Sequence, residues 1–315
     1  MVNYLLQRVA VLAATLVSAS LIVFTVMSIL PGNAAEALLG PSATPQAVAA
    51  LAHKLGLDQP VALRYAHWIA GVARGDFGLS YAYGSPIALL IGSSLAISAP
   101  LAILAMALSV LIALSAGVYA ADRNRRPGDS IVMAASQIGI AVPNFWLAIL
   151  LVIVFSVTLR LTPAGGFPGW GEPLLALRAL ILPAVALAVV QAAILTRVTR
   201  SALLEALSED FMRTARAKGV SRRAALWRHA LPNALVPILT IMGLQFANLI
   251  AGAIVVENVF VLPGIGRLIL LSISNRDTLV VEDCVMLIAI IVIGLNFAVD
   301  LACAAIDPRL RNPAV

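Results

Sequence analysis

Residues 205–237 read EALSEDFMRTARAKGVSRRAALWRHALPNALVP, and they form a polar and basic stretch in an otherwise apolar chain. The stretch carries six lysine or arginine residues, and Gly219 interrupts it near the middle. Long apolar runs precede and follow it. A polar insert of this length between two apolar runs predicts a sizeable loop on one side of a membrane.

The composition of the whole chain supports a membrane protein. The chain has 315 residues, of which 61% are apolar and only 11% are charged, and its mean hydropathy is +1.00. Soluble domains are about a quarter charged, so a soluble globular protein is excluded. The net charge of +6 could indicate nucleic-acid binding in a soluble chain. Here the basic residues sit in short loops, as the positive-inside rule describes.

Several apolar runs reach the roughly 20 residues that a helix needs to cross the hydrocarbon core of a membrane. The first run is longer than the core of a signal peptide, so we expect it to be retained as a helix. Pro100 and Pro143 are expected to kink or end their helices. The sequence predicts an all-α polytopic protein with six spans: Val9–Leu30, Leu95–Ala121, Ile131–Val157, Leu180–Thr196, Leu235–Val256 and Cys284–Ala305.

The segment 31–94, after the first span, has a mixed composition. Thr44 and Pro45 are suited to the N-cap and first position of a short helix. Residues 61–72 form an amphipathic pattern, and its apolar face contains Tyr65, Trp68 and Ile69. A segment of this length and regularity predicts a small ordered cap on the outer surface of the membrane.

The distribution of basic residues predicts the orientation. Fourteen of the 21 lysine and arginine residues fall in the N-terminus, the loops 122–130 and 197–234, and the C-terminal tail. The segments on the other side hold the remaining seven, although they are longer. We therefore expect both termini and the loop 197–234 to be cytoplasmic.

The sequence contains no motif of a known catalytic chemistry. It lacks the P-loop pattern, so this chain is not expected to bind and hydrolyse a nucleotide. It also lacks H-E-x-x-H and G-x-S-x-G, and its three histidines are scattered among loops. Cys284 and Cys303 would lie at different depths of the last span, which disfavours a disulfide or a metal pair. We expect a protein that is not an enzyme and binds no metal.

Polar residues within the spans leave two interpretations open. Gln245 and Asn248 are three residues apart and share a helix face. They could line a translocation path together with Asn144, or they could form hydrogen bonds between helices, as polar residues of membrane bundles often do. Asp300 in the last span is a candidate functional carboxylate, but pairing with Arg309 or Arg311 near the cytoplasmic surface is favoured.

The order of residues in the basic loop predicts two short helices. Ser208 is suited to cap the first helix, which would end at Lys218, with Gly219 as its stop. Ser221 would cap a second helix over 222–230, and Leu231-Pro232 would end it. Ala215 and Ala217 would then lie on the surface of a compact knob. Such a knob is suited to insertion into a groove on a partner protein.

The loop resembles the EAA motif of permeases from importers of the ATP-binding cassette class. That motif reads E-A-A, three residues, Gly, nine residues, an apolar residue, any residue and Leu-Pro. When Gly219 is aligned with its glycine, Ala215 and Leu231-Pro232 match the pattern. The chain departs from it at three positions: Arg213 replaces the glutamate, Thr214 replaces the first alanine, and His229 replaces the apolar residue.

More of the chain is similar to the first permease subunit of the dipeptide, oligopeptide and nickel branch of these importers. The matching strings occur in the same order over nearly the full length. After Arg276-Asp277 this chain departs from the branch, because Thr278-Leu279 and Glu282-Asp283 replace a proline and a Gln-Gly pair. The matching strings are YLLQR (4–8), LPGN (30–33), LGLDQP (55–60), RY..W (64–68), GDFGLS (75–80), VPNF (142–145), LTPAGG (161–166), RTARAKG (213–219), RHALPNAL (228–235) and VVENVFVLPGIGRL (255–268).

The resemblance implies a type I importer permease in the bacterial inner membrane, most closely one for di- or oligopeptides. It implies an N-terminal region (1–94), a transmembrane domain (95–306) and a tail (307–315). The expected partners are a second permease, two ATP-binding subunits and an extracytoplasmic solute-binding protein. ATP and Mg²⁺ would be bound by the partner subunits, and this chain would hold no cofactor.

The resemblance also implies roles for individual residues. The loop 205–233 would couple to the ATPase subunits through Glu209, Asp210, Arg213, Thr214, Ala215, Arg216, Ala217, Lys218, Gly219, Leu231 and Pro232. An external gate or binding-protein contact would involve Glu257, Pro263, Gly264 and Arg267. Two rival functions are a secondary transporter or channel that works without ATPase subunits, and a purely structural membrane scaffold.

Overall fold

The computed structural model describes residues 2–29, 34–40 and 42–306, and these residues are mostly helical. Within these ranges the only extended pairing is an isolated antiparallel bridge between Leu79 and Pro86. The helices in chain order are α1 (Val2–Ile29), α2 (Ala34–Leu39), α3 (Pro45–Lys54), α4 (Val61–Arg74), α5 (Ile87–Asp122), α6 (Pro127–Ala141), α7 (Asn144–Leu151), the π-helix η1 (Val152–Thr158), α8 (Pro173–Ser208), α9 (Asp210–Ala217), α10 (Arg222–Ala225), the π-helix η2 (Leu226–Ala230), α11 (Leu231–Val259), α12 (Ile265–Ser274) and α13 (Thr278–Ile306).

Five helices in the described part of the chain are long and apolar enough to cross a membrane. They are α1 from Leu6, α5, α8, the continuous run Arg222–Val259, and α13. The pair formed by α6 and the run Asn144–Thr158 makes a sixth span if it is counted as one broken span. The predicted class, an all-α polytopic membrane protein, is confirmed.

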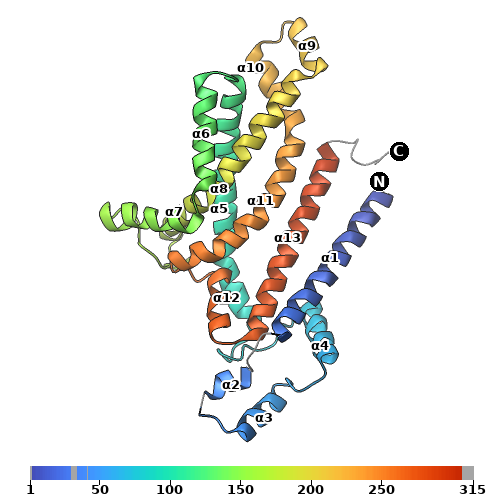
Figure 1. Cartoon of the computed structure of the whole chain (residues 1–315), viewed down its shortest axis with the longest axis vertical. Coiled ribbons are helices and arrows are strands. Elements are labelled where there is room, and N and C mark those ends of the chain that lie inside the picture. Colours follow the sequence, from blue (N-terminus) through green and yellow to red (C-terminus); the bar gives the residue numbers. More distant parts are fainter. Residues whose placement is uncertain (1, 30–33, 41, 307–315) are drawn as a thin grey trace. The chain divides into compact units, whose positions relative to one another are not determined.

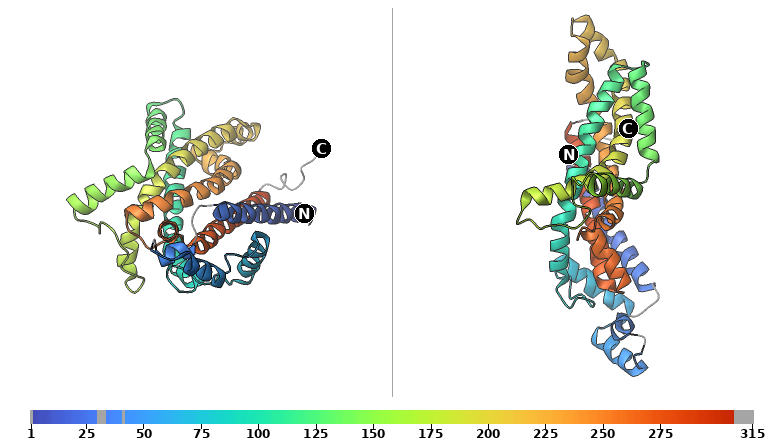
Figure 2. Two further views of the ribbon diagram at one scale, coloured as in Figure 1. Left: turned by 60° about the horizontal axis from the view of Figure 1, so that its bottom comes forward. Right: turned by 90° about the vertical axis from the view of Figure 1, so that its left-hand side faces the viewer.

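The sequence predicts a third span over Ile131–Val157, but the structure does not form one straight helix there. The span breaks at Val142-Pro143, and its two halves differ in direction by 96° (Figures 1 and 2). Pro143 has no amide hydrogen to donate, and its ring forces Val142 into an extended conformation, with φ −83° and ψ 120°. Pro143 therefore ends α6, whereas Pro100 does not end α5, which continues to Asp122.

The chain divides into two compact units, and each has its own buried apolar clusters. The first unit consists of Ala99–Leu262 with Leu295–Val315, of which the structure describes residues up to 306. The second unit consists of Val2–Ser98 with Pro263–Gly294.

In the first unit, α8 is the central helix, because α6, α7 and α11 all contact it (Figure 1). Glycines allow close approach at these contacts. A Cβ atom at Gly117 of α5 would lie 2.7 Å from the Cβ of Thr199, and one at Gly139 of α6 would lie 2.9 Å from the Cβ of Ala193. Small residues at helix contacts are typical of membrane bundles, since lipid offers no hydrophobic driving force between helices.

In the second unit, the predicted apolar face of α4 packs as expected. Trp68 is buried and stacks on Phe24 of α1, with ring centroids 5.8 Å apart. Tyr65 packs edge-on against Phe24, and Ile69 joins the same cluster. The amphipathic pattern therefore reflects packing of α4 against α1.

The short helix α3 begins as the sequence predicts. The hydroxyl of Thr44 accepts a hydrogen bond from the amide of Ala47 at 3.3 Å, and Pro45 occupies the first turn. Two groups of predicted residues, the LPGN string at 30–33 and the tail with Arg309 and Arg311, lie outside the described residues.

Candidate functional site: the segment between α8 and α11

The start of α9 differs from the prediction by one residue. Ser208 is the last residue of α8, and its hydroxyl donates to the carbonyl oxygen of Glu205 at 2.7 Å. Ser208 therefore does not cap α9, because its hydroxyl already serves the preceding helix. Glu209 is the N-cap residue without a side-chain capping bond, and Asp210 stands in the first turn. A carboxylate there interacts favourably with the positive end of the helix dipole.

Gly219 ends α9, as predicted. Its φ is +85°, which is the left-handed conformation that glycine adopts without steric cost. The amide of Gly219 donates to Arg216 O at 3.0 Å, and the amide of Val220 donates to Ala215 O at 3.2 Å. These two bonds satisfy carbonyl groups at the end of the helix and turn the chain back toward α10.

The next helix begins as predicted but does not end as predicted. The hydroxyl of Ser221 caps α10 by accepting from the amide of Ala224 at 3.4 Å. Leu231-Pro232 does not stop the helix, since α10, η2 and α11 form one continuous helical run to Val259. The change of hydrogen-bond register in the π turn accommodates Pro232, which has no amide to donate. The second helix predicted for the knob, residues 222–230, is thus the first part of the fifth membrane span.

The helix α9 is amphipathic, and only one face is buried. Met212 is 2% exposed and belongs to an apolar cluster with Leu203 and Leu226. Ala215 is half-buried. Figure 1 shows α9 and α10 beyond the ends of α8 and α11, in the first unit. The exposed face contains Arg213, Thr214, Arg216, Ala217, Lys218 and Gly219.

Among the described residues, three ion pairs lie in or next to the segment between α8 and α11. Arg213 and Asp210 form a pair of 3.4 Å on the exposed surface, and such pairs contribute little stability. Arg222 of α10 donates through Nε to Asp122 Oδ1 at 3.0 Å. Arg200 of α8 pairs with buried Asp129 of α6. Sequence reasoning missed these last two pairs, although Asp129 follows Pro127 in a basic loop, which is a weak signal of a helix start.

The polar residues of the fifth span do share a face. The Nδ2 of Asn248 donates to Oε1 of Gln245 at 3.0 Å, and both residues belong to α11. Gln245 is buried and its Nε2 has no partner, whereas Asn248 is exposed. Asn144, at the start of α7, contacts the same helix: a Cβ atom on Gly252 of α11, one turn from Asn248, would be 2.6 Å from its Nδ2. Asn144 therefore occupies a tight contact between helices.

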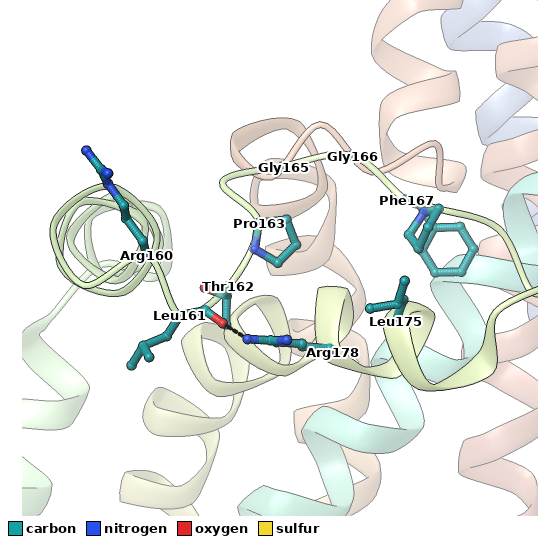
Figure 3. A pocket seen from close by; sticks show the side chains of 10 residues that line it. Arg160, Leu161, Thr162, Pro163, Gly165, Gly166, Phe167, Leu175 and Arg178 are labelled. Atoms are coloured by element: carbon teal, nitrogen blue, oxygen red, sulfur yellow. Dashed lines mark hydrogen bonds between the residues drawn. The ribbon is translucent and has the colours of Figure 1, made fainter.

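A groove of about 620 Å³ lies where the chain leaves η1 and enters α8 (Figure 3). The segment 161–166 arches over it and is anchored at two points. The guanidinium of Arg178 donates to the carbonyl oxygen of Leu161, and the amide of Gly166 donates to Phe260 O at 2.8 Å. Phe167 and Leu175 form an apolar wall, and Arg160 lines the groove at the end of η1 (Figure 3).

The residues of the predicted external gate differ in exposure. Glu257 is 1% exposed at the end of α11, and its carbonyl oxygen accepts from the amide of Leu262 at 2.8 Å. In the second unit, Gly264 is the buried N-cap of α12, Pro263 is exposed and Arg267 is half-buried. Pro263 and Arg267 thus have surface that a partner could contact.

Two related families of known proteins together match most of this chain. Residues 113–312 match the family described as binding-protein-dependent transport system inner membrane component, and residues 1–111 match the N-terminal family of the same membrane components. The chain belongs to this family. The predicted class, a permease of a binding-protein-dependent importer, is thereby confirmed.

Curated relatives of the permease match it from end to end. A peptide transport system permease protein of Brucella abortus (strain 2308) is 39% identical over 312 residues, covering 99% of both chains. The glutathione transport system permease protein GsiC of Escherichia coli (strain K12) is 40% identical over 312 residues, also covering 99% of both chains. A solved amino acid ABC transporter has a TM-score of 0.48 and 18% identity, covering 70% of this chain and 94% of that chain.

Proposed function

We propose that this permease is part of an ATP-driven importer of di- or oligopeptides and that the segment 205–233 receives the mechanical input. The chain has no nucleotide-binding motif of the P-loop type, so the energy would come from separate subunits. ATP and Mg²⁺ would be bound by those subunits and not by this chain.

One observation carries the proposal. The buried side chain of Met212 anchors α9 in the apolar cluster, while its exposed surface carries Arg213, Arg216 and Lys218 and small residues at Ala217 and Gly219, with Phe211 exposed in its first turn. A firmly attached helix with a small-residue tip can enter a cleft of a partner and transmit movement to α8 and α11, which flank it. Closure of two ATPase subunits would then act on these two long helices.

The importer would contain three kinds of partner. A second permease would complete the translocation path, two ATP-binding subunits would dock on the segment 205–233, and a solute-binding protein would deliver the solute from outside. The excess of basic residues in the loops 122–130 and 197–234 supports a cytoplasmic location for both termini in the bacterial inner membrane. Pro263 and Arg267 would belong to the opposite, outer side.

Peptides are the solute class that the relatives support best, because their printed names specify peptide and glutathione transport. Within this chain, Gln245 and Asn248 would line the path. The unpartnered Nε2 of Gln245 supports this role, since a buried donor without a partner is costly unless a solute or water satisfies it. The Oδ1 of Asn144 is also buried without a partner, and its contact with Gly252 lies one turn from Asn248, which supports the same role for Asn144.

Site-directed cross-linking tests the docking surface. Both native cysteines are buried, so Ala217→Cys would introduce a single exposed thiol on α9. We expect a short bifunctional reagent to link this thiol to an ATP-binding subunit in the purified complex. The matched control is Ala82→Cys, which is exposed between α4 and α5 and should link to no ATP-binding subunit. Failure of Ala217→Cys to link in an intact complex would contradict the docking surface.

The rival function is a secondary transporter or channel that needs no ATPase. Uptake by the chain in proteoliposomes without ATP-binding subunits, driven by a proton gradient and abolished by Asp300→Asn, would support that rival. We expect no uptake under these conditions, and uptake only when the ATP-binding subunits and ATP are present.

A further inference from the structure

The turn between α5 and α6, residues 122–127, is connected to the two helical segments on either side of α9. On one side, Arg200 of α8 donates through Nε to Asp129 Oδ1 at 2.5 Å and through Nη2 to Asp129 Oδ2 at 2.7 Å. Asp129 is only 4% exposed and also accepts from the amide of Arg125 at 3.1 Å. This two-pronged geometry fixes both the distance and the orientation of the two groups.

On the other side, Arg222 of α10 holds the beginning of the same turn. Its Nε donates to Asp122 Oδ1 at 3.0 Å, and its Nη2 donates to the carbonyl oxygen of Asp122. Arg200 precedes α9 in the chain and Arg222 follows it. Arg200 also donates through Nη2 to Asn124 Oδ1 of the turn at 3.2 Å, so the turn and the adjoining start of α6 are tied both to the helix that leads into α9 and to the helix that leads out of it.

The turn itself is built to resist deformation. Arg125 adopts a positive φ of 62°, and the bond from its amide to Asp129 holds that conformation. Gly128 packs closely against Tyr119, since a Cβ atom on Gly128 would be 2.8 Å from the phenol oxygen of Tyr119. Arg123 in turn lies over the same ring at 5.1 Å. A displacement at one end of such a turn is passed to the other end rather than absorbed.

We propose that the turn 122–127 is a second part of the coupling element, and that Asp129, Arg200, Asp122 and Arg222 are positioning residues that transmit movement of α9 to α5 and α6. This inference rests on the proposed function of α9. The movement would reach α6 through the Asp129–Arg200 pair and α5 through the Asp122–Arg222 pair. The glycine contacts of α5 and α6 with α8 leave no slack between these helices.

A purely structural role for the two pairs would lower the amount or thermal stability of the complex without changing its coupling. A role in transmission changes the number of solute molecules moved for each ATP hydrolysed. That ratio, measured in proteoliposomes with the complete importer and a dipeptide as solute, is therefore the decisive quantity.

The test compares variants of the two pairs with one matched control. Asp122→Asn breaks the exposed pair with Arg222, and Arg200→Lys keeps the charge but loses the bidentate geometry of its bond to Asp129. We expect both variants to hydrolyse ATP while the transport ratio falls about fivefold or more. The control is Arg197→Gln, which removes an exposed bond of 2.8 Å from α8 to Gln137 of α6, one turn from Arg200, and should leave the ratio unchanged.

A further test exchanges the two residues of the Asp122–Arg222 pair. The double variant Asp122→Arg with Arg222→Asp should recover part of the transport that Asp122→Arg alone loses. Unchanged ratios in Asp122→Asn and Arg200→Lys would overturn the inference. The variant Gly219→Val serves as the reference. If it uncouples transport while the pair variants do not, only the further inference fails; if it does not uncouple transport, the proposed function of α9 fails.

Discussion

The indole Nε1 of Trp68 donates a hydrogen bond of 2.8 Å to Oδ1 of Asp283, across 215 residues of sequence and inside the core of the second unit. Asp283 is fully buried, and its other oxygen, Oδ2, has no partner. The pair ties α4 to the beginning of α13.

We predict that Trp68→Phe destabilises the second unit by about 1–3 kcal/mol, because a buried carboxylate loses its donor. Thermal unfolding of the purified protein measures this loss. Asp283→Asn is the matched control, since its amide oxygen can still accept from Trp68 and the buried charge is removed. Equal unfolding temperatures for Trp68→Phe and the unaltered protein would contradict the prediction.

Gly219→Val should uncouple transport from ATP hydrolysis while the protein still inserts into the membrane. The positive φ of +85° is strained for a β-branched residue, although no atom lies within 4 Å of a Cβ placed there. The strain should therefore displace the end of α9 without a clash. Uptake and ATPase activity in proteoliposomes measure the effect, and Gly84→Val, with φ +61° and equally open space, is the control for strain elsewhere. Normal uptake with normal solute-stimulated ATPase activity in Gly219→Val would contradict this prediction.

Two glycines of α5 should respond differently to the same substitution. Gly117→Ala places a methyl group 2.7 Å from the side chain of Thr199, so α5 and α8 must separate. Gly92→Ala meets nothing within 4 Å and should stabilise the helix by about 0.5–1 kcal/mol, because alanine has the higher helix propensity. We expect Gly117→Ala to lower the unfolding temperature and Gly92→Ala to keep or raise it. The opposite order would show that the contact between α5 and α8 is looser than the structure has it.

The pair formed by His53 and Asp58 should respond to pH. The imidazole Nδ1 of His53 lies 2.6 Å from Oδ2 of Asp58, and this hydrogen bond, with the charge of the carboxylate, raises the pKa of His53 above 6.5. The same bond lowers the pKa of Asp58 below 3.8. The raised pKa of His53 contributes stability that is present below pH 6.5 and lost as the pH rises through the folded value.

The lowered pKa of Asp58 contributes stability that is lost as the pH falls through its folded value. The pair should therefore protect the end of α3 best at mildly acidic pH. An NMR titration of the imidazole checks this, and Asp58→Asn should move the midpoint of His53 downward. An unchanged midpoint in Asp58→Asn would show that the two side chains do not interact in solution.

Arg178→Ala should loosen the arch over the groove near η1. The guanidinium of Arg178 holds the carbonyl oxygen of Leu161, and without it the arch keeps the bond from Gly166 to Phe260 at its other end. We expect faster proteolysis within 159–166 and little change in the unfolding temperature. Arg160→Ala is the matched control, because it removes another arginine that lines the groove and leaves the bond from Arg178 to Leu161 in place. Equal cleavage rates in the two variants would show that Arg178 does not anchor the arch.

Local patterns were enough to predict much of this permease. Apolar runs predicted the spans, and the capping residues Thr44 and Ser221 act as expected because a cap involves only neighbouring residues. Gly219 ends α9 for the same reason. The prediction failed at Ser208, whose hydroxyl bonds to the preceding turn of α8 instead of capping α9. It also failed at Pro232, where the helix continues through a π turn instead of ending.

The amino-acid sequence by itself determined the membrane class, the six apolar runs, the family and the position of the segment between α8 and α11, since composition, periodicity and motif order are local properties. Only the tertiary structure decided that the third span bends by 96° and that Arg200 and Arg222 hold the turn between α5 and α6. Pro143 alone predicted a break but not its angle, and the two arginine bonds join residues 71 and 100 positions apart, a separation that no periodic pattern encodes.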